Sequence, residues 1–256
     1  MLKTRVIPCL LLKGTGLVKT IKFKNPVYLG DPINAVKIFN DKEVDELVFL
    51  DIDASKLNAP PNFELLKNVT DECFMPLAYG GGVKTIEQIK MLLKIGIEKV
   101  ILNTACHDEA DFLKESVRIF GSSTLVGSMD VKRSFWGKMT VFVKGGTKDT
   151  KQDPVDYAKR LEEMGVGEIL LNSIDHDGVM AGYDLALIEA VSHAVSIPVV
   201  ACGGAGALND FGAAKLAGAS GVAAGSMFVF QGPHKAVLIS YPSAKQMEDA
   251  LGQPSA

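Results

Sequence analysis

The sequence lacks the patterns that mark a metal-bound, disulfide-linked or membrane-spanning protein. Its cysteines number four, without the spacing of a metal site: Cys9, Cys73, Cys106 and Cys202. We therefore expect reduced thiols, a cytoplasmic protein, and no metal or cofactor. No run of about 18 apolar residues predicts a transmembrane helix, so no membrane partner is expected.

An excess of charge of one sign is also absent. The net charge is −3, which predicts no nucleic-acid partner. The start, MLKTRVIPCLLLKG, has only a short apolar run that Pro8 interrupts and Lys13 ends, so it predicts a first strand rather than a signal peptide. Hydrophobic residues make up 47%, with 25 glycines, which is typical of a packed α/β core. We expect one domain, residues 1–256.

Short, nearly continuous apolar runs recur along the chain, as in parallel strands buried on both faces. The expected strands are 5–12, 46–52, 76–80, 98–104, 123–130, 167–173, 197–202 and 220–226. Helical patterns such as 85–95 and 153–164 lie between them, and Gly96 and Gly165 follow as stops. Eight strands alternating with helices predict an α/β fold, a (β/α)8 TIM barrel. A doubly wound open sheet is the alternative.

The second half of the chain repeats the first. Gly204 follows Gly82 by 122 residues, within the parallel segments 75–104 and 197–226. Between the segments 5–13 and 124–132 the offset slips to 119, which sets Leu11 opposite Asp130. Two halves of four βα units each favour closure into one ring.

Glycine-rich turns follow the third and the seventh expected strands, at Gly80–Gly82 and Gly203–Gly206. Glycine lets backbone N–H groups approach an anion, although most such pairs only form turns. Small polar residues end the next strand in each half: Asn103 and Thr104, then Gly225 and Ser226. The repeat predicts two anion sites on opposite sides of the barrel mouth, which suit one substrate with a phosphate at each end.

Asp130 ends the fifth expected strand, because Val131–Arg133 is interpreted as leaving the barrel wall. A buried carboxylate there can act as a general acid or base, or it can pair with Lys13 or Lys132. Other polar residues at the mouth remain open candidates for substrate binding or acid–base chemistry: Lys19, Asp51 and Asp177. Lys19 lies in the expected loop after the first strand, where it either neutralises phosphate or is solvated.

Charged residues begin four of the apolar strands, where they either face water or form an alternating ring across the barrel floor: Arg5, Glu46, Lys99 and Glu168. The spacing alone leaves both possibilities open.

The segments RVIPCLLLK, DELVFLDIDAS, YGGGV, KVILNTA, GEILLNSIDHDGVMAGYD and ACGGAG together resemble the cyclase subunit of imidazole glycerol phosphate synthase. The resemblance implies a heterodimer with a glutaminase, which docks at the barrel floor and releases ammonia through the barrel to a bisphosphorylated substrate. It implies that the four floor charges form the ammonia gate. It implies phosphate-binding roles for Gly82, Asn103, Thr104, Gly178, Gly204, Gly225 and Ser226.

The chain departs from this family at Leu11, where the family carries an aspartate that forms an acid–base pair with the one matched by Asp130. The segment 19–32 also differs from the family's flexible loop over the substrate. We therefore expect a divergent synthase or cyclase-like subunit that transfers ammonia to another phosphorylated or sugar-linked acceptor, in amidino-sugar biosynthesis for surface polysaccharide. The alternatives are a genuine cyclase of histidine biosynthesis, a non-catalytic barrel that docks and activates a glutaminase, and a sugar-phosphate isomerase.

Overall fold

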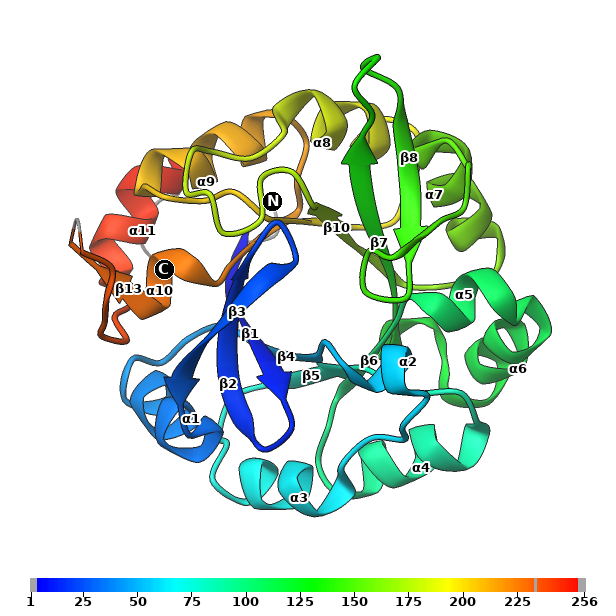
Figure 1. Ribbon diagram of the computed structural model, residues 1–256, viewed down its shortest axis with the longest axis horizontal. Coiled ribbons are helices and arrows are strands. Elements are labelled where there is room, and N and C mark those ends of the chain that lie inside the picture. The colour runs from blue at the N-terminus through cyan, green and yellow to red at the C-terminus, as the bar shows by residue number, and fades with distance from the viewer. Residues whose placement is uncertain (1–3, 233, 253–256) are drawn as a thin grey trace.

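The computed structural model describes residues 4–232 and 234–252, and within them eight parallel strands close into a barrel (Figure 1). The barrel strands are β1 (Arg5–Lys13), β4 (Leu47–Asp51), β5 (Leu77–Gly80), β6 (Lys99–Leu102), β7 (Leu125–Arg133), β10 (Glu168–Ser173), β11 (Val199–Cys202) and β12 (Gly221–Ala224). The ring closes where β12 pairs with β1, and β7 pairs with β10 between the halves. The predicted barrel is confirmed, and the open-sheet alternative is wrong because such a sheet keeps two unpaired edges.

Helices surround the barrel on its outside (Figure 1). They are α1 (Pro32–Asp41), α3 (Phe63–Asp71), α4 (Ile86–Lys94), α6 (Ala110–Phe120), α7 (Pro154–Glu163), α8 (Leu185–Ser192), α9 (Leu208–Leu216) and α11 (Ala244–Leu251). The sequence sets several starts: Thr85 and Gln88 form a capping box before α4, and Asp153 caps α7 ahead of Pro154. No helix in the described ranges is long and apolar enough to cross a membrane.

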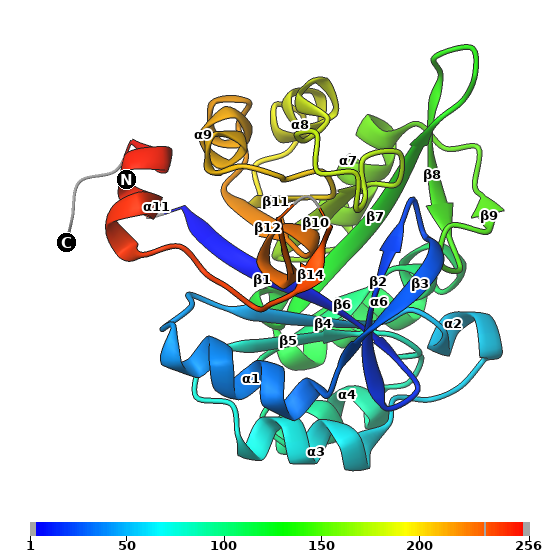
Figure 2. The ribbon, with the colours of Figure 1, turned by 60° about the vertical axis from the view of Figure 1, so that its left-hand side comes forward.

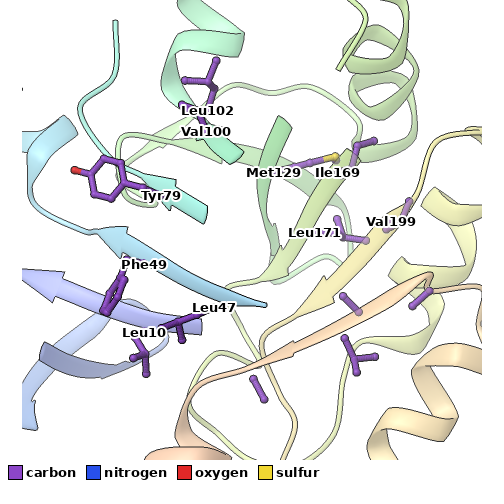
Figure 3. Close-up of a cluster of buried hydrophobic side chains, with 14 of the residues drawn as sticks. Leu10, Leu47, Phe49, Tyr79, Val100, Leu102, Met129, Ile169, Leu171 and Val199 are labelled. Carbon is purple, nitrogen blue, oxygen red and sulfur yellow. The ribbon is translucent and has the colours of Figure 1, made fainter. Parts of the chain in front are cut away.

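Two apolar layers explain why the strands are nearly continuous in apolar residues. One face of each strand packs against the helices, through side chains such as Leu10, Phe49 and Tyr79 (Figure 3). The other face fills the barrel interior, with smaller side chains such as Val48 and Ala223. Each barrel strand is therefore buried on both faces, as parallel strands usually are.

Two barrel strands run beyond the wall and fold back as antiparallel ribbons at the mouth. β1 continues into β2 (Gly16–Ile21) and β3 (Lys24–Gly30), and β7 continues into β8 (Met139–Val143) and β9 (Lys148–Asp149). Figure 2 shows both ribbons on the side away from the start of β1. Lys132 and Arg133 pair only with β8, so the chain leaves the barrel wall here as predicted, while Val131 still pairs with Ser173 of β10. One prediction is corrected: 19–32, expected as a loop, is mostly β-hairpin, because antiparallel pairing satisfies its backbone.

Short elements complete the mouth and the connections. They are α2 (Ala54–Leu57), α5 (Thr104–Asp108), α10 (Ser226–Val229), the 3₁₀ turn Ser122–Thr124, β13 (Phe230–Gln231) and β14 (Ala236–Val237).

The strand register reproduces the internal repeat. Leu11 pairs with Leu50 of β4, and Asp130 pairs with Asn172 of β10, which follows Leu50 by 122 residues. Leu11 and Asp130 therefore occupy equivalent places in the two halves of the barrel.

Candidate active site

A cavity of about 670 Å³ opens at the carboxyl ends of the barrel strands. Its volume is within the range of small-molecule sites. The lining includes most of the mouth residues that the sequence singled out, although not Gly206: Lys19, Asp51, Gly82, Asn103, Thr104, Asp130, Asp177, Gly178, Gly204, Gly225 and Ser226. The fold thus brings together residues from all parts of the chain.

Asp130 is the acid–base candidate with the clearest surroundings. Its side chain is buried, and each carboxylate oxygen accepts one amide hydrogen bond. Asn103 Nδ2 lies 3.2 Å from Oδ2, and Asn172 Nδ2 lies 3.4 Å from Oδ1. Burial raises the pKa of Asp130 to about 7, while the Asn172 bond opposes the rise and the charge of Asp177 adds to it. A carboxyl with this pKa can accept and return a proton near neutral pH.

The salt-bridge alternative for Asp130 is wrong. Lys13 Nζ instead lies 3.6 Å from a carboxylate oxygen of Asp53. Lys132 Nζ lies 5.7 Å from the ring centroid of Phe142, across the ribbon. Both ammonium groups therefore have other neighbours, and Asp130 is held by neutral amides.

Leu11 lines the cavity on the opposite half and brings no proton-transfer group. The nearby acids are already engaged. Asp51 Oδ1 accepts the amide N–H groups of Asp53 and Ala54 at 3.1 and 3.0 Å, and burial raises its pKa. Asp177 binds Lys19, as described next. Neither carboxylate lies on β1, the strand that carries Leu11.

Lys19 lies in strand β2 rather than in a loop, and it is only 7% exposed. Its Nζ is 2.7 Å from Asp177 Oδ1, and the Thr20 hydroxyl donates to Asp177 Oδ2 at 2.9 Å. Of the two alternatives for Lys19, the solvated lysine is therefore wrong. A Cβ at Gly225 would lie 3.2 Å from Lys19 Cε, so this ion pair borders the second anion site.

At the second predicted anion site, Gly204 has φ +128°, a conformation that favours glycine, and a Cβ there would lie 2.1 Å from the carbonyl oxygen of Gly182. Gly178 packs as closely on the carbonyl oxygen of Thr20. The buried Ser226 hydroxyl has no hydrogen-bond partner within the described part of the chain. Buried polar groups generally have a partner, so this hydroxyl is suited to a ligand oxygen.

The first predicted anion site has a similar close-packed glycine backbone. Gly82 has φ +70°, and a Cβ there would lie 2.3 Å from the carbonyl oxygen of Ala59. The Thr104 hydroxyl differs from its counterpart because it is already engaged. It accepts the Lys144 backbone N–H at 3.0 Å and lies 3.4 Å from Asn103 Oδ1, to which it donates.

The four charges of the barrel floor form one ring. Arg5 bridges Glu46 and Glu168, and Lys99 Nζ lies 3.0 Å from Glu46 and 3.4 Å from Glu168. Burial alone would lower the pKa of Arg5, but the two carboxylates outweigh it and raise that pKa. The alternating ring is present in the structure, and its role as a gate remains a prediction.

Asn172 is a site residue that the sequence reasoning missed. It interrupts the apolar run EILLNS, where a polar side chain facing the interior is a signal. Its Nδ2 contacts Asp130, and its Oδ1 is buried without a partner among the residues described. This amide is well placed to hold Asp130 and to accept a further hydrogen bond.

Comparison with known proteins agrees with this geometry. Residues 5–234 match the family described as "Histidine biosynthesis protein". The chain is 54% identical to "Putative imidazole glycerol phosphate synthase subunit hisF2" of Pseudomonas aeruginosa, over 97% of this chain and 99% of that protein. It is 47% identical to the similarly named hisF3 of Vibrio vulnificus, over 98% and 97%.

A further relative is "Imidazole glycerol phosphate synthase subunit HisF" of Streptomyces coelicolor, which is 43% identical over 90% of this chain and 91% of that protein. The chain therefore belongs to the histidine-biosynthesis barrel family, within its group of imidazole glycerol phosphate synthase cyclase subunits.

Proposed function

We propose that this chain is the ammonia-using synthase subunit of a glutamine amidotransferase. A glutaminase partner docks at the floor ring, ammonia passes through the barrel, and a phosphorylated substrate binds at the mouth. The observation that carries the proposal is the placement of the charged ring and the paired anion loops at opposite ends of the same strands. Small interior side chains such as Ala78 and Ala223 suit passage of a small neutral molecule.

The first candidate reaction is the ring-closing synthesis of imidazole glycerol phosphate, the product that the relatives' names specify. Asp130 supplies one acid–base group, and the two anion loops suit a substrate with a phosphate at each end. The comparisons favour this candidate.

Leu11 favours a second candidate, in which the chain delivers ammonia to a different acceptor, such as a sugar in amidino-sugar biosynthesis. Its apolar side chain takes the place equivalent to Asp130 on the other half-barrel. Loss of a general acid or base typically slows a reaction by about 10²–10⁴-fold. Ring closure by the unaltered chain is therefore expected to be slow.

Complementation of a histidine auxotroph that lacks its own cyclase subunit tests the two candidates. Ammonium-rich medium removes the need for this chain's glutaminase. We expect poor growth with the unaltered chain and better growth with Leu11→Asp, because the variant restores the missing carboxylate. Leu11→Asn, of similar size but unable to transfer a proton, is the matched control.

Each outcome decides between the candidates. Robust growth with the unaltered chain establishes the ring-closing reaction and rejects the second candidate. Growth with Leu11→Asp alone supports the second candidate for the unaltered chain. No growth with either chain rejects the ring-closing candidate and shows that the pocket differs by more than this one carboxylate.

A further inference from the structure

The two ends of the mouth cavity differ in charge. Three lysines line the end beside the Gly80–Gly82 loop: Lys56, Lys84 and Lys144. Beside the Gly203–Gly204 loop the described lining contains Lys19, whose ammonium is paired with Asp177 at 2.7 Å. Uncompensated positive charge is therefore concentrated at the first end.

Lys84 follows the first glycine loop in the chain, and the segment around α2 holds its side chain there. A Cβ at Gly82 would collide with the carbonyl oxygen of Ala59, so this segment lies directly on the loop. Lys84 Nζ donates to Asn58 Oδ1 in the same segment. The side chain is thereby held at the cavity edge.

The other two lysines meet at the turn after β8: Lys144 belongs to this turn, and Lys56 of α2 packs against it. The backbone N–H of Lys144 donates to the Thr104 hydroxyl at 3.0 Å. A Cβ at Gly145 would lie 2.5 Å from Lys56 Cε, so Lys56 lies against this turn. Figure 1 shows α2 beside the loop that connects β8 to β9. Three separate segments therefore meet at one edge.

The carboxylates on this side neutralise the three ammonium groups only in part. None of the lysines forms an ion pair with a residue in the described ranges. Asp108 is paired with Lys148 at 3.1 Å, and Asp51 accepts two backbone N–H groups. Asp51 and Glu109 line this end without a cationic partner among the described residues. Three ammonium groups therefore face two unpaired carboxylates, and the edge keeps an excess of one positive charge.

We propose that this edge binds a diphosphate group of the substrate. A phosphate monoester carries about −1.5 to −2 charges near neutral pH, and a diphosphate extends further and carries more. Three lysines spread over separate segments match the extended group better than a single phosphate, since each ammonium acts as a point charge. The second end, with its Ser226 hydroxyl, takes a single phosphate. This inference rests on the second candidate of the proposed function, because the ring-closing candidate takes a substrate with one phosphate at each end.

The test compares the binding of inorganic phosphate and inorganic pyrophosphate to the full chain by calorimetry at fixed ionic strength. Pyrophosphate should bind about 10-fold or more tightly than phosphate, because it engages additional ammonium groups. Replacing Lys56, Lys84 or Lys144 by alanine should weaken pyrophosphate binding about 3–10-fold, with a smaller effect on phosphate. Lys148→Ala, at a neighbouring but paired lysine, is the matched control and should change neither affinity.

Equal affinities for the two anions, or a triple alanine variant that keeps the pyrophosphate preference, would overturn the inference. Phosphate binding that is lost in Ser226→Ala but shows no pyrophosphate advantage rejects only this inference. Absence of binding by either anion also rejects the substrate sites of the proposed function. Uridine diphosphate and farnesyl diphosphate then distinguish a nucleotide from a lipid source, because the correct source should bind more tightly than pyrophosphate.

Discussion

At the scale of single residues, the acid–base chemistry proposed for the mouth depends on how Asp130 is held. Two neutral amides donate to its oxygens, at 3.2 and 3.4 Å, while burial pushes its pKa upward. Hydrogen bonds to the ionised form favour that form, so the amides limit the rise. The position of Asp130 was predictable from the repeat. Its amide partners were not, because their side chains meet only when β6, β7 and β10 become neighbours.

Asn172→Leu should raise the pKa of Asp130 above about 7, because the variant removes a donor to the carboxylate. A hydrogen bond to a charged group contributes about 1.5–3 kcal/mol, so the rise should be about one pKa unit or more. Any reaction that uses Asp130 as a base should shift its acidic limb to higher pH. Carboxyl carbon NMR measures the titration directly.

Asn68→Leu, at an exposed position of α3, is the control for the Asn172 variant. It should leave the Asp130 titration unchanged. A pKa of Asp130 that stays the same or falls in Asn172→Leu would show that this amide does not stabilise the carboxylate.

At the scale of secondary-structure elements, the eight barrel strands follow from the apolar runs, but the two mouth ribbons do not. The β2 segment mixes polar and apolar residues, and the sequence reasoning interpreted 19–32 as loop. The β8 segment is an apolar run, but it is short and lies outside the eight-strand repeat. Burial of Lys19 was missed for a related reason: its partner Asp177 lies 158 residues away in the chain. Long-range pairing of this kind leaves no local pattern to detect.

The glycine loops permit a test at this scale. Gly204→Ala should lower the free energy of unfolding by about 3 kcal/mol or more, because it adds backbone strain and a clash with the carbonyl oxygen of Gly182. Gly30→Ala has a similar φ, +143°, but meets no atom within 4 Å, so it should cost only about 1–2 kcal/mol. Urea unfolding of both variants measures the difference. Equal losses would show that close packing at Gly204 contributes nothing.

At the scale of the whole molecule, the barrel joins a charged floor to the cavity at its mouth, the proposed anion site, through an apolar interior. The repeat predicted the ring of strands and the two glycine loops, since these recur at fixed spacing. It could not predict their unequal charge. Lys84 lies within the repeated segment but opposite Gly206, and only the folded chain brings it beside Lys56 and Lys144.

The most direct test of the account is the ratio of glutamine-dependent to ammonium-dependent product formation by the complex with its glutaminase, in Lys99→Met. Lys99 contacts both floor carboxylates, so its loss should open or misalign the ring. The account predicts a fall of about 10-fold or more in the ratio, with ammonium-dependent activity retained and glutamine hydrolysis continuing. Lys90→Met on α4, outside the ring, should leave the ratio unchanged. An unchanged ratio in Lys99→Met would contradict passage of ammonia through the floor.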